Sequence, residues 1–408
     1  MTLAKTFGVA VSLALAAAIL AEDGPGRTPA SKPASGPASL PASAPVYTVW
    51  PFDSKEAARR QDETAKALGL PKELTLDLGG SVTMKLVLIP AGKFTMGSPD
   101  QEQKALIKKL VAEWGQEDEF TEEIGSEGPQ HEVTISQPFY MSVYPVTQAQ
   151  YEQVAGRNPS VYKAADNPVE AVTWLEARGF CRKVSGKTGK AVRLPTEAQW
   201  EWAARAGTAT PFHTGRTIST DQANYDGTMV YGDGQKGENR RKTTSAGAFK
   251  PNPFGLYDMH GNVWQWCADW YGKGYYAVSS KEDPRGPSAG EKRVLRGGCW
   301  CNGPWCSRSA ARGAKEPDFA CSSFGFRVAV LLSEPAIPGV DTSAVAILIR
   351  RLGDDKYQVR EEATAKLIEM GEDVCPLLEA ALKEAGLDPE AKHRIALVLR
   401  KLGGAEPQ

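Results

Sequence analysis

Alternating apolar and polar residues predict a helix and then a β-hairpin near the start of the folded chain. Residues 54–68 are expected to form a short helix that Ser54 caps. Residues 74–78 and 84–89 alternate apolar with polar side chains on either side of two glycines. This pattern is typical of two antiparallel strands joined by a tight turn. We therefore expect the globular domain to begin near this hairpin.

Three further helices are predicted before residue 207. Thr147 and Thr196 are each followed three residues later by a glutamine, which is the pattern of a capping box. The helix after Thr147 is expected to end at Gly156. Between these two helices, residues 169–185 place apolar side chains at spacings of three and four, which predicts a helix with one buried stripe. Cys181 lies on that stripe and is interpreted as a core residue, because free cysteine behaves as a small hydrophobe.

Regular periodicity fades over residues 208–340, where glycines, aromatic residues and turn residues are frequent. Within this region, residues 255–329 combine glycine, tryptophan and cysteine without a helical or strand pattern, which predicts an irregular core packed by aromatic rings. The same stretch contains five of the seven cysteines, which are Cys267, Cys299, Cys301, Cys306 and Cys321. If the protein catalyses a reaction, we expect its catalytic residues in this stretch.

The C-terminal segment shows strong helical periodicity again. Residues 341–402 contain four amphipathic segments separated by glycines. Residues 352–364 resemble a HEAT-like repeat, so a small all-α helical-repeat module is predicted. We expect this module either to bind a protein partner or to act as a capping module.

The N-terminus has the features of an export signal. Lys5 precedes an apolar run over residues 7–20, which is short for a membrane span. We predict a signal peptide over residues 1–21 and a Pro/Ala/Ser-rich linker over residues 22–46. An uncleaved anchor or a short core helix is the alternative. The mature protein is expected to be bacterial, periplasmic or secreted, and without a membrane span, in a compartment that permits disulfides.

Overall charge and histidine usage narrow the function classes. The 48 basic and 49 acidic residues give a formal net charge of -1, which argues against nucleic acid or an anionic membrane as the main partner. The four histidines are well separated in sequence, so a histidine-built zinc or iron site is poorly supported. Seven cysteines is an odd number, so at least one is free unless it pairs between chains.

Several motifs in one collinear order carry a family resemblance. They include Arg193-Leu-Pro-Thr-Glu-Ala-Gln-Trp, Gly255-Leu-Tyr-Asp-Met-His-Gly-Asn-Val-Trp, Arg296-Gly-Gly and Gly325-Phe-Arg. Together they resemble the formylglycine-generating enzyme, or sulfatase-modifying factor, family over residues 85–332, with residues 47–84 as an N-terminal extension. The resemblance implies an α+β fold, a C-type-lectin-like architecture with low regular secondary structure.

The same resemblance implies a copper-dependent oxidase. Active members hold Cu(I) with two cysteines just after Arg-Gly-Gly and convert a cysteine of a sulfatase polypeptide to formylglycine, and Cys301 and Cys306 have the required separation. Both would be copper ligands and catalytic residues, since soft thiolates select Cu(I). The segment departs from the pattern, because Asn302 replaces the usual histidine and the first cysteine lies one residue nearer the glycines.

Two alternatives to the oxidase stay open. One is a structural disulfide, either between Cys301 and Cys306 or with Cys299 or Cys321. The protein would then be a non-catalytic, lectin-like binding module for a peptide, a glycan or a protein partner. The other is a sulfoxide-forming iron oxidase of the broader family, which the four scattered histidines disfavour.

The resemblance also implies two Ca²⁺ sites. The first maps onto Asn224, Tyr225, Asn239 and Arg241, and the second onto Asp258, Gly261, Val263 and Gln265. A carboxylate is lost at Asn239 and another at Gln265, so weaker calcium binding is expected. Loops held by hydrogen bonds alone are the alternative, above all at Gln265.

Overall fold

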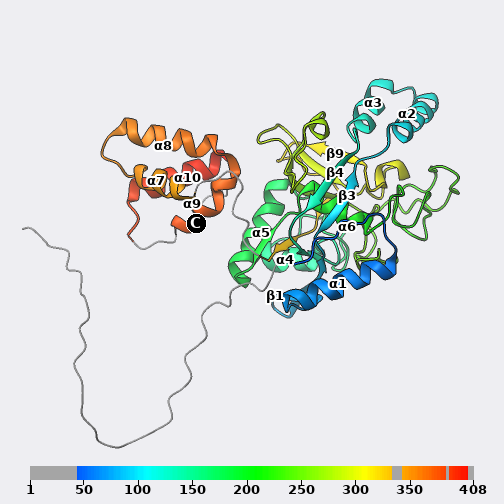
Figure 1. Ribbon diagram of the computed structural model, residues 1–408, viewed down its shortest axis with the longest axis horizontal. Helices are drawn as coiled ribbons and strands as arrows, with labels where there is room; N and C mark the ends of the chain where they lie inside the picture. The colour runs from blue at the N-terminus through cyan, green and yellow to red at the C-terminus, as the bar shows by residue number, and fades with distance from the viewer. Residues whose placement is uncertain (1–43, 333–341, 383–385, 403–408) are drawn as a thin grey trace, which may run out of the picture. The chain divides into compact units, whose positions relative to one another are not determined.

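The computed structural model describes residues 44–332, 342–382 and 386–402 (Figure 1). The predicted signal peptide and nearly all of the predicted linker lie outside the described residues. In the described ranges, no helix combines the length and the apolarity needed to cross a bilayer.

Helices α1 to α6 precede the least regular part of the domain. Their bounds are Ser54–Leu68 for α1, Asp100–Trp114 for α2, Glu117–Gly125 for α3, Gln148–Ala155 for α4, Trp174–Thr188 for α5 and Glu197–Arg205 for α6. The capping boxes at Thr147 and Thr196 are confirmed. Asp53, not Ser54, caps α1, because its extended backbone lets its carboxylate accept from the Glu56 amide. Helix α5 begins at Trp174, five residues later than residue 169, because Thr173 forms a capping box with Glu176.

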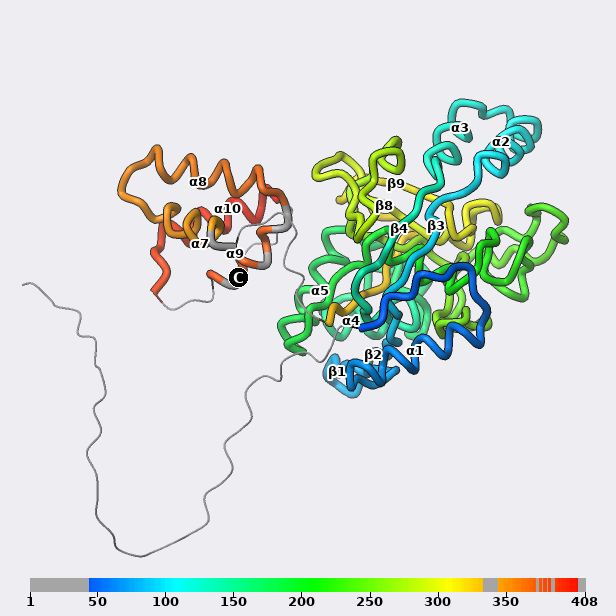
Figure 2. Tube along the Cα trace, in the orientation of Figure 1, coloured from blue at the N-terminus to red at the C-terminus, as the bar shows by residue number. Residues whose placement is uncertain are grey.

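Eleven strands form three sheets within the described residues. Their bounds are Glu73–Gly79 for β1, Val82–Ile89 for β2, Gly92–Met96 for β3, His131–Ile135 for β4, Phe139–Ser142 for β5, Ala191–Arg193 for β6, Trp264–Trp270 for β7, Arg293–Arg296 for β8, Arg312–Lys315 for β9, Phe324–Phe326 for β10 and Ala329–Leu331 for β11. The sheet orders are β1-β2-β5-β11-β6, β10-β7-β8-β9 and β3-β4. The predicted hairpin is confirmed as β1 and β2. Figure 2 traces β3 and β4 side by side, as their antiparallel register requires.

Two sequence-based expectations need correction. Residues 255–329 are not irregular throughout, because they supply all four strands of the β10-β7-β8-β9 sheet. Regular structure is nevertheless absent from residues 208–263, as expected. Helices α2 and α3 were not predicted; they bury Leu106, Leu110, Phe120 and Ile124 in a small cluster that also contains residues from the segment 212–231.

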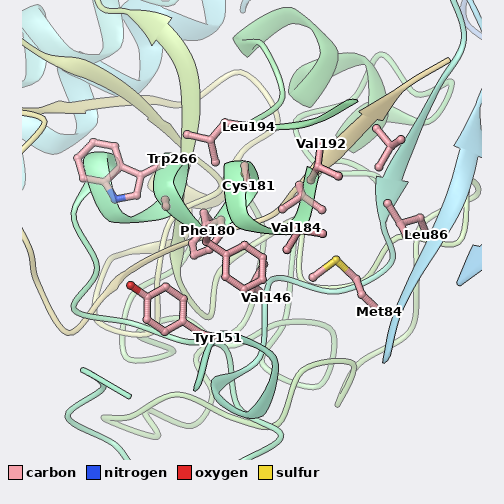
Figure 3. Close-up of a cluster of buried hydrophobic side chains, with 14 of the residues drawn as sticks. Met84, Leu86, Val146, Tyr151, Phe180, Cys181, Val184, Val192, Leu194 and Trp266 are labelled. Atoms are coloured by element: carbon pink, nitrogen blue, oxygen red, sulfur yellow. The ribbon is translucent and has the colours of Figure 1, made fainter. Parts of the chain in front are cut away.

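One large core lies between the five-stranded sheet and helix α5. Figure 3 shows Phe180, Cys181 and Val184 of α5 among side chains from strands β2 and β6 and from Trp266 of β7. Cys181 is buried there, which confirms its interpretation as a core residue. Trp266 of β7 packs in the same core as the five-stranded sheet. The positions of the loops around β7 and β8 are therefore set by this packing.

The C-terminal segment is helical, as predicted. Its helices are α7 Thr342–Arg351, α8 Tyr357–Glu369, α9 Cys375–Leu382 and α10 Pro389–Lys401, with a short 3-10 helix at Gly371–Val374. They share one apolar cluster that includes Leu352, Leu367 and Leu378. Cys375 is buried in that cluster, as predicted. The helices are present, whereas the HEAT-like repeat stays a prediction.

Candidate functional site

The candidate site is the segment that joins β8 to β9. After Arg296 the chain turns through Gly297 and Gly298, whose φ angles are +97° and +71°. A Cβ at Gly298 would lie 2.5 Å from the Ser307 hydroxyl and 2.9 Å from the Cys306 carbonyl. Only glycine therefore allows the chain to pass this closely over the short 3-10 helix η2, Pro304–Ser307.

Arg296 binds the part of this segment that leads back to β9. Its side chain is fully buried, and its guanidinium donates to the carbonyls of Ser309, Ala310 and Ala311 at 2.7–2.8 Å. It also forms an ion pair with Glu201 of α6. Helix α6 therefore fixes the segment through a buried charge pair.

His260 fixes η2 from the other side. Its Nδ1 lies 2.7 Å from the Ser307 carbonyl, and its Nε2 accepts from the His213 amide at 3.0 Å. Burial lowers the pKa of His260 well below its usual value. The ring is neutral, and it links His213 to the end of η2.

The three cysteines of the segment have different surroundings. Cys299 is buried, Cys301 is exposed and Cys306 is half-buried, and all described cysteines are unlinked. The Cys299 and Cys301 sulfurs lie 3.1 Å apart. In the described part of the chain, no hydrogen bond joins Cys306 to either sulfur. The structure thus brings Cys301 together with Cys299, a neighbour that the predicted copper pair did not include.

These cysteines also differ in the pKa of their thiols. A hydrogen bond from the Cys299 thiol lowers the pKa of Cys301. Burial raises the pKa of Cys306, and the charge of Glu123 raises it further. Cu(I) is bound by thiolates, and the lowered pKa of the exposed Cys301 suits such a ligand. The Cys301–Cys306 copper pair stays a prediction.

The first predicted calcium site contains an unsatisfied oxygen. Asn224 is buried, and its Nδ2 donates to the Lys242 carbonyl and to Asn262. Its Oδ1 is buried and has no protein partner. A bound cation would satisfy this oxygen, so the residues fit Ca²⁺. The nearby Asn239 Oδ1 accepts from the amide of Arg241, at which φ is +55°.

Gln265 of the second predicted calcium site is hydrogen-bonded to protein groups. The Gln265 Oε1 accepts from Trp200 at 2.8 Å and from Arg327 at 2.6 Å. Its Nε2 donates to the Asp258 carbonyl at 2.7 Å, and the Asp258 carboxylate accepts from Gly247. These contacts favour the alternative of a loop held by hydrogen bonds at Gln265, and the second Ca²⁺ site stays a prediction. Among the described residues, no cluster of three acidic, cysteine or histidine side chains could hold a metal.

Two residues that matter to the site were not predicted. Cys299 was considered only as a disulfide partner, although the Cys-Trp-Cys spacing was a readable signal. Asn302 was noted only as a missing histidine. In the structure its Oδ1 accepts from the Trp264 indole at 2.7 Å and lies 3.0 Å from the Cys299 sulfur.

These features define an α+β domain of sparse regular structure, with a cysteine-bearing turn after a buried Arg-Gly-Gly. Residues 80–332 match the sulfatase-modifying factor enzyme 1-like domain family, and the chain belongs to this family.

Curated relatives share this domain but carry different names. The chain is 33% identical to the serine/threonine-protein kinase pkn1 of Chlamydia pneumoniae over 61% of the chain, and spans 38% of that relative's length. It is 30% identical to the formylglycine-generating enzyme of Mus musculus, over 68% of the chain and 82% of the relative. It is 28% identical to the inactive C-alpha-formylglycine-generating enzyme 2 of Bos taurus, over 62% of the chain and 90% of the relative.

Solved structures agree on the fold. Treponema denticola variable protein 1 is 26% identical with a TM-score of 0.51, covering 64% of this chain and 99% of its own. PvdO from Pseudomonas aeruginosa is 30% identical with a TM-score of 0.50, covering 64% and 98%.

Proposed function

We propose that this domain recognises a polypeptide that presents a cysteine, and that it does so without copper-dependent oxidation. The observation that carries the proposal is the arrangement of sulfurs. Cys301 is exposed beside Cys299, while Cys306 is half-buried and, among the described residues, makes no hydrogen bond to either sulfur. The relatives named above also include an inactive enzyme, so membership of the family does not itself imply oxidation.

Aromatic side chains beside Cys301 offer a surface for such a polypeptide. The rings of Tyr162 and Trp300 meet edge to face at 5.4 Å, and both are half-buried. Val161, next to Tyr162, is 62% exposed. Half-buried aromatic rings provide contact area with little loss of side-chain entropy, which suits peptide recognition.

The test is a binding titration with a fluorescent peptide that contains a Cys-x-Pro-x-Arg segment. We expect saturable binding that Tyr162→Ala weakens at least tenfold, while the exposed control Val278→Ala leaves it unchanged. After incubation with oxygen and Cu(I), the peptide is recovered and its mass is measured by mass spectrometry. No binding would overturn the proposal, and formylglycine in the recovered peptide would replace it with the second candidate.

The second candidate is the copper-dependent oxidase itself. The lowered pKa and exposure of Cys301 favour it, because an accessible thiolate is a good Cu(I) ligand. Cys301 and Cys306 would hold the ion, which supplies the redox chemistry with oxygen. Titration of the reduced protein with Cu(I) tests this. One tightly bound equivalent, lost in both Cys301→Ala and Cys306→Ala, would support the oxidase.

We also propose that Ca²⁺ binds at the first predicted site, through Asn224, Tyr225, Asn239 and Arg241. The unsatisfied Asn224 oxygen supports this. Millimolar Ca²⁺ should raise the melting temperature of the wild type and not that of Asn224→Ala. An equal rise in Gln265→Ala is expected, since Gln265 is committed to protein partners. A calcium effect that survives in Asn224→Ala would exclude this site.

Export and a partner for the C-terminal helices complete the proposal. We propose that the protein is exported to the periplasm or secreted, and that residues 341–402 bind a protein partner. N-terminal sequencing of protein from fractionated cells tests the first point. A mature N-terminus near residue 22 in the exported fraction is expected, and an intact Met1 there would contradict signal cleavage.

A further inference from the structure

The Cys299–Trp300–Cys301 turn places two cysteines of opposite exposure in contact. The side chain of Cys299 is 1% exposed, whereas Cys301 faces solvent. Their sulfurs lie 3.1 Å apart, so an approach of about 1 Å would bring them to the length of a disulfide bond. Neither recognition of a polypeptide nor copper binding through Cys306 uses Cys299.

Hydrogen bonds hold this turn on every side. The Asn302 amide donates to the Cys299 carbonyl, which closes the turn itself. The Trp300 amide donates to the Asn262 carbonyl, and the Trp300 indole donates to Ser322. The Asp226 amide donates to the Asn302 carbonyl. The two thiols are therefore held together by the surrounding backbone, so ring closure costs little additional chain entropy.

Opposite exposure also suits the two cysteines to different steps. Solvent reaches Cys301, whereas the side chain of Cys299 is buried. An exposed cysteine can attack a disulfide, and a buried neighbour can resolve the resulting mixed disulfide.

We propose that Cys299 and Cys301 form a thiol–disulfide exchange site that acts on accessible disulfides. The Cys301 thiolate attacks one sulfur of the substrate disulfide and breaks that bond, and the released thiolate takes a proton from water. Cys299 then attacks the Cys301 sulfur, and the second substrate sulfur leaves with the Cys299 proton. Cys299 and Cys301 are oxidised to one disulfide, and the substrate disulfide is reduced to two thiols.

Cys321 and Cys306 are the competing partners. Cys321 is half-buried and accepts from the Ser323 hydroxyl at 3.4 Å. In the described residues, no hydrogen bond links the sulfur of Cys321 or Cys306 to that of Cys301. The exchange pair is therefore Cys301 with Cys299, and Cys321 provides the control substitution.

The full chain is equilibrated with mixtures of reduced and oxidised glutathione, quenched with acid, alkylated and mapped by mass spectrometry. We expect one internal disulfide, Cys299–Cys301, to appear as the oxidised fraction rises. A Cys301–Cys306 or Cys301–Cys321 bond, or thiols that stay reduced at every ratio, would overturn the proposal. This readout needs no substitution, so it does not depend on the folding of a variant.

Variants then assign the roles. Cys301→Ser should slow reduction of an aromatic disulfide reagent at least tenfold, and Cys299→Ser should accumulate a stable glutathione adduct on Cys301. Cys321→Ser should exchange like the wild type. An adduct on Cys301 that is equally stable with Cys299 present would show that Cys299 does not resolve it and would overturn the proposal. The assay contains no copper and no peptide, so its failure is independent of the proposed function.

Discussion

Arg327 donates a 2.6 Å hydrogen bond from its Nε to the Gln265 Oε1, the same oxygen that accepts from Trp200. Burial lowers the pKa of Arg327 to about 9, so the guanidinium remains charged at neutral pH and relies on this acceptor. The side-chain oxygen of Gln265, a residue that the family resemblance assigns to a calcium site, therefore accepts hydrogen bonds from two protein groups.

Replacing Gln265 tests whether its side-chain oxygen stabilises the fold. Gln265→Ala would leave the Trp200 indole and the Arg327 Nε buried without an acceptor, which should cost about 2–5 kcal/mol of unfolding free energy. Gln265→Glu keeps an acceptor beside the charged guanidinium, so its loss should be clearly smaller. Urea denaturation with a constant slope checks both values. Equal losses in the two variants would show that the acceptor oxygen is not what matters.

A second prediction concerns the buried charges behind the cysteine turn. The Glu201 Oε1 accepts from Arg205 at 2.9 Å, and its Oε2 is paired with Arg296. Glu201→Ala would leave two buried guanidiniums without this carboxylate, and should cost about 3–5 kcal/mol. The control is Asp100→Ala, which removes an exposed pair with Lys104 and should change stability by less than about 1 kcal/mol. Urea midpoints provide the comparison, and similar shifts in both variants would contradict a special role for the buried pair.

The helices show which parts of the fold were readable from sequence. Thr147 and Thr196 predict the starts of their helices, because a capping box involves two residues only three positions apart in the sequence. Helices α2 and α3 begin at Asp100 and Glu117. The residues before them, Pro99 and Gln116, make no side-chain cap, so only the spacing of their apolar residues could have revealed them. Strand β8 was missed because its four buried residues are too few to show a period.

The site was predictable only in part, for a different reason. The motif placed the chemistry after Arg296 through a resemblance, and the cysteines do lie on one segment there. The contact between Cys299 and Cys301 depends on the turn conformation, and the pairing of Arg296 with Glu201 joins residues 95 positions apart. Such long-range charge pairing has no local signature, so the sequence could not show it.

A third prediction tests the glycine turn that supports the cysteines. Gly298→Ala should destabilise the domain by more than about 1 kcal/mol and alter the reactivity of Cys301, because the new Cβ meets Ser307 and the Cys306 backbone at a positive φ. Gly156→Ala is the matched control, since Gly156 also has a positive φ but no atom within 4 Å of the added Cβ. Gly156→Ala should lose about 1 kcal/mol of unfolding free energy, which is the cost of placing a residue with a Cβ in the left-handed backbone conformation. Thermal unfolding and thiol alkylation rates measure both effects.

The last prediction concerns pH and Asp269 of strand β7. Asp269 is buried, and burial raises the pKa of its carboxyl from 3.8 to about 7, with the nearby Glu197 charge raising it further. The folded protein therefore holds a proton that the unfolded chain releases, so the neutral carboxyl contributes stability below pH 4 that is lost as pH rises towards 7.

Asp269→Asn removes this titration while keeping an oxygen that can accept from the Glu197 amide, as the carboxylate does at 2.8 Å. The stability of the wild type relative to this variant should fall between pH 4 and pH 7, with a slope on the order of 1.4 kcal/mol per pH unit. Urea unfolding of both proteins at four pH values in that range measures the difference. A difference that stays flat, or that grows in favour of the wild type as pH rises, would mean that Asp269 is ionised in the folded domain. The carboxylate would then be stabilised by Arg293 and Arg312, the two cations that act on it.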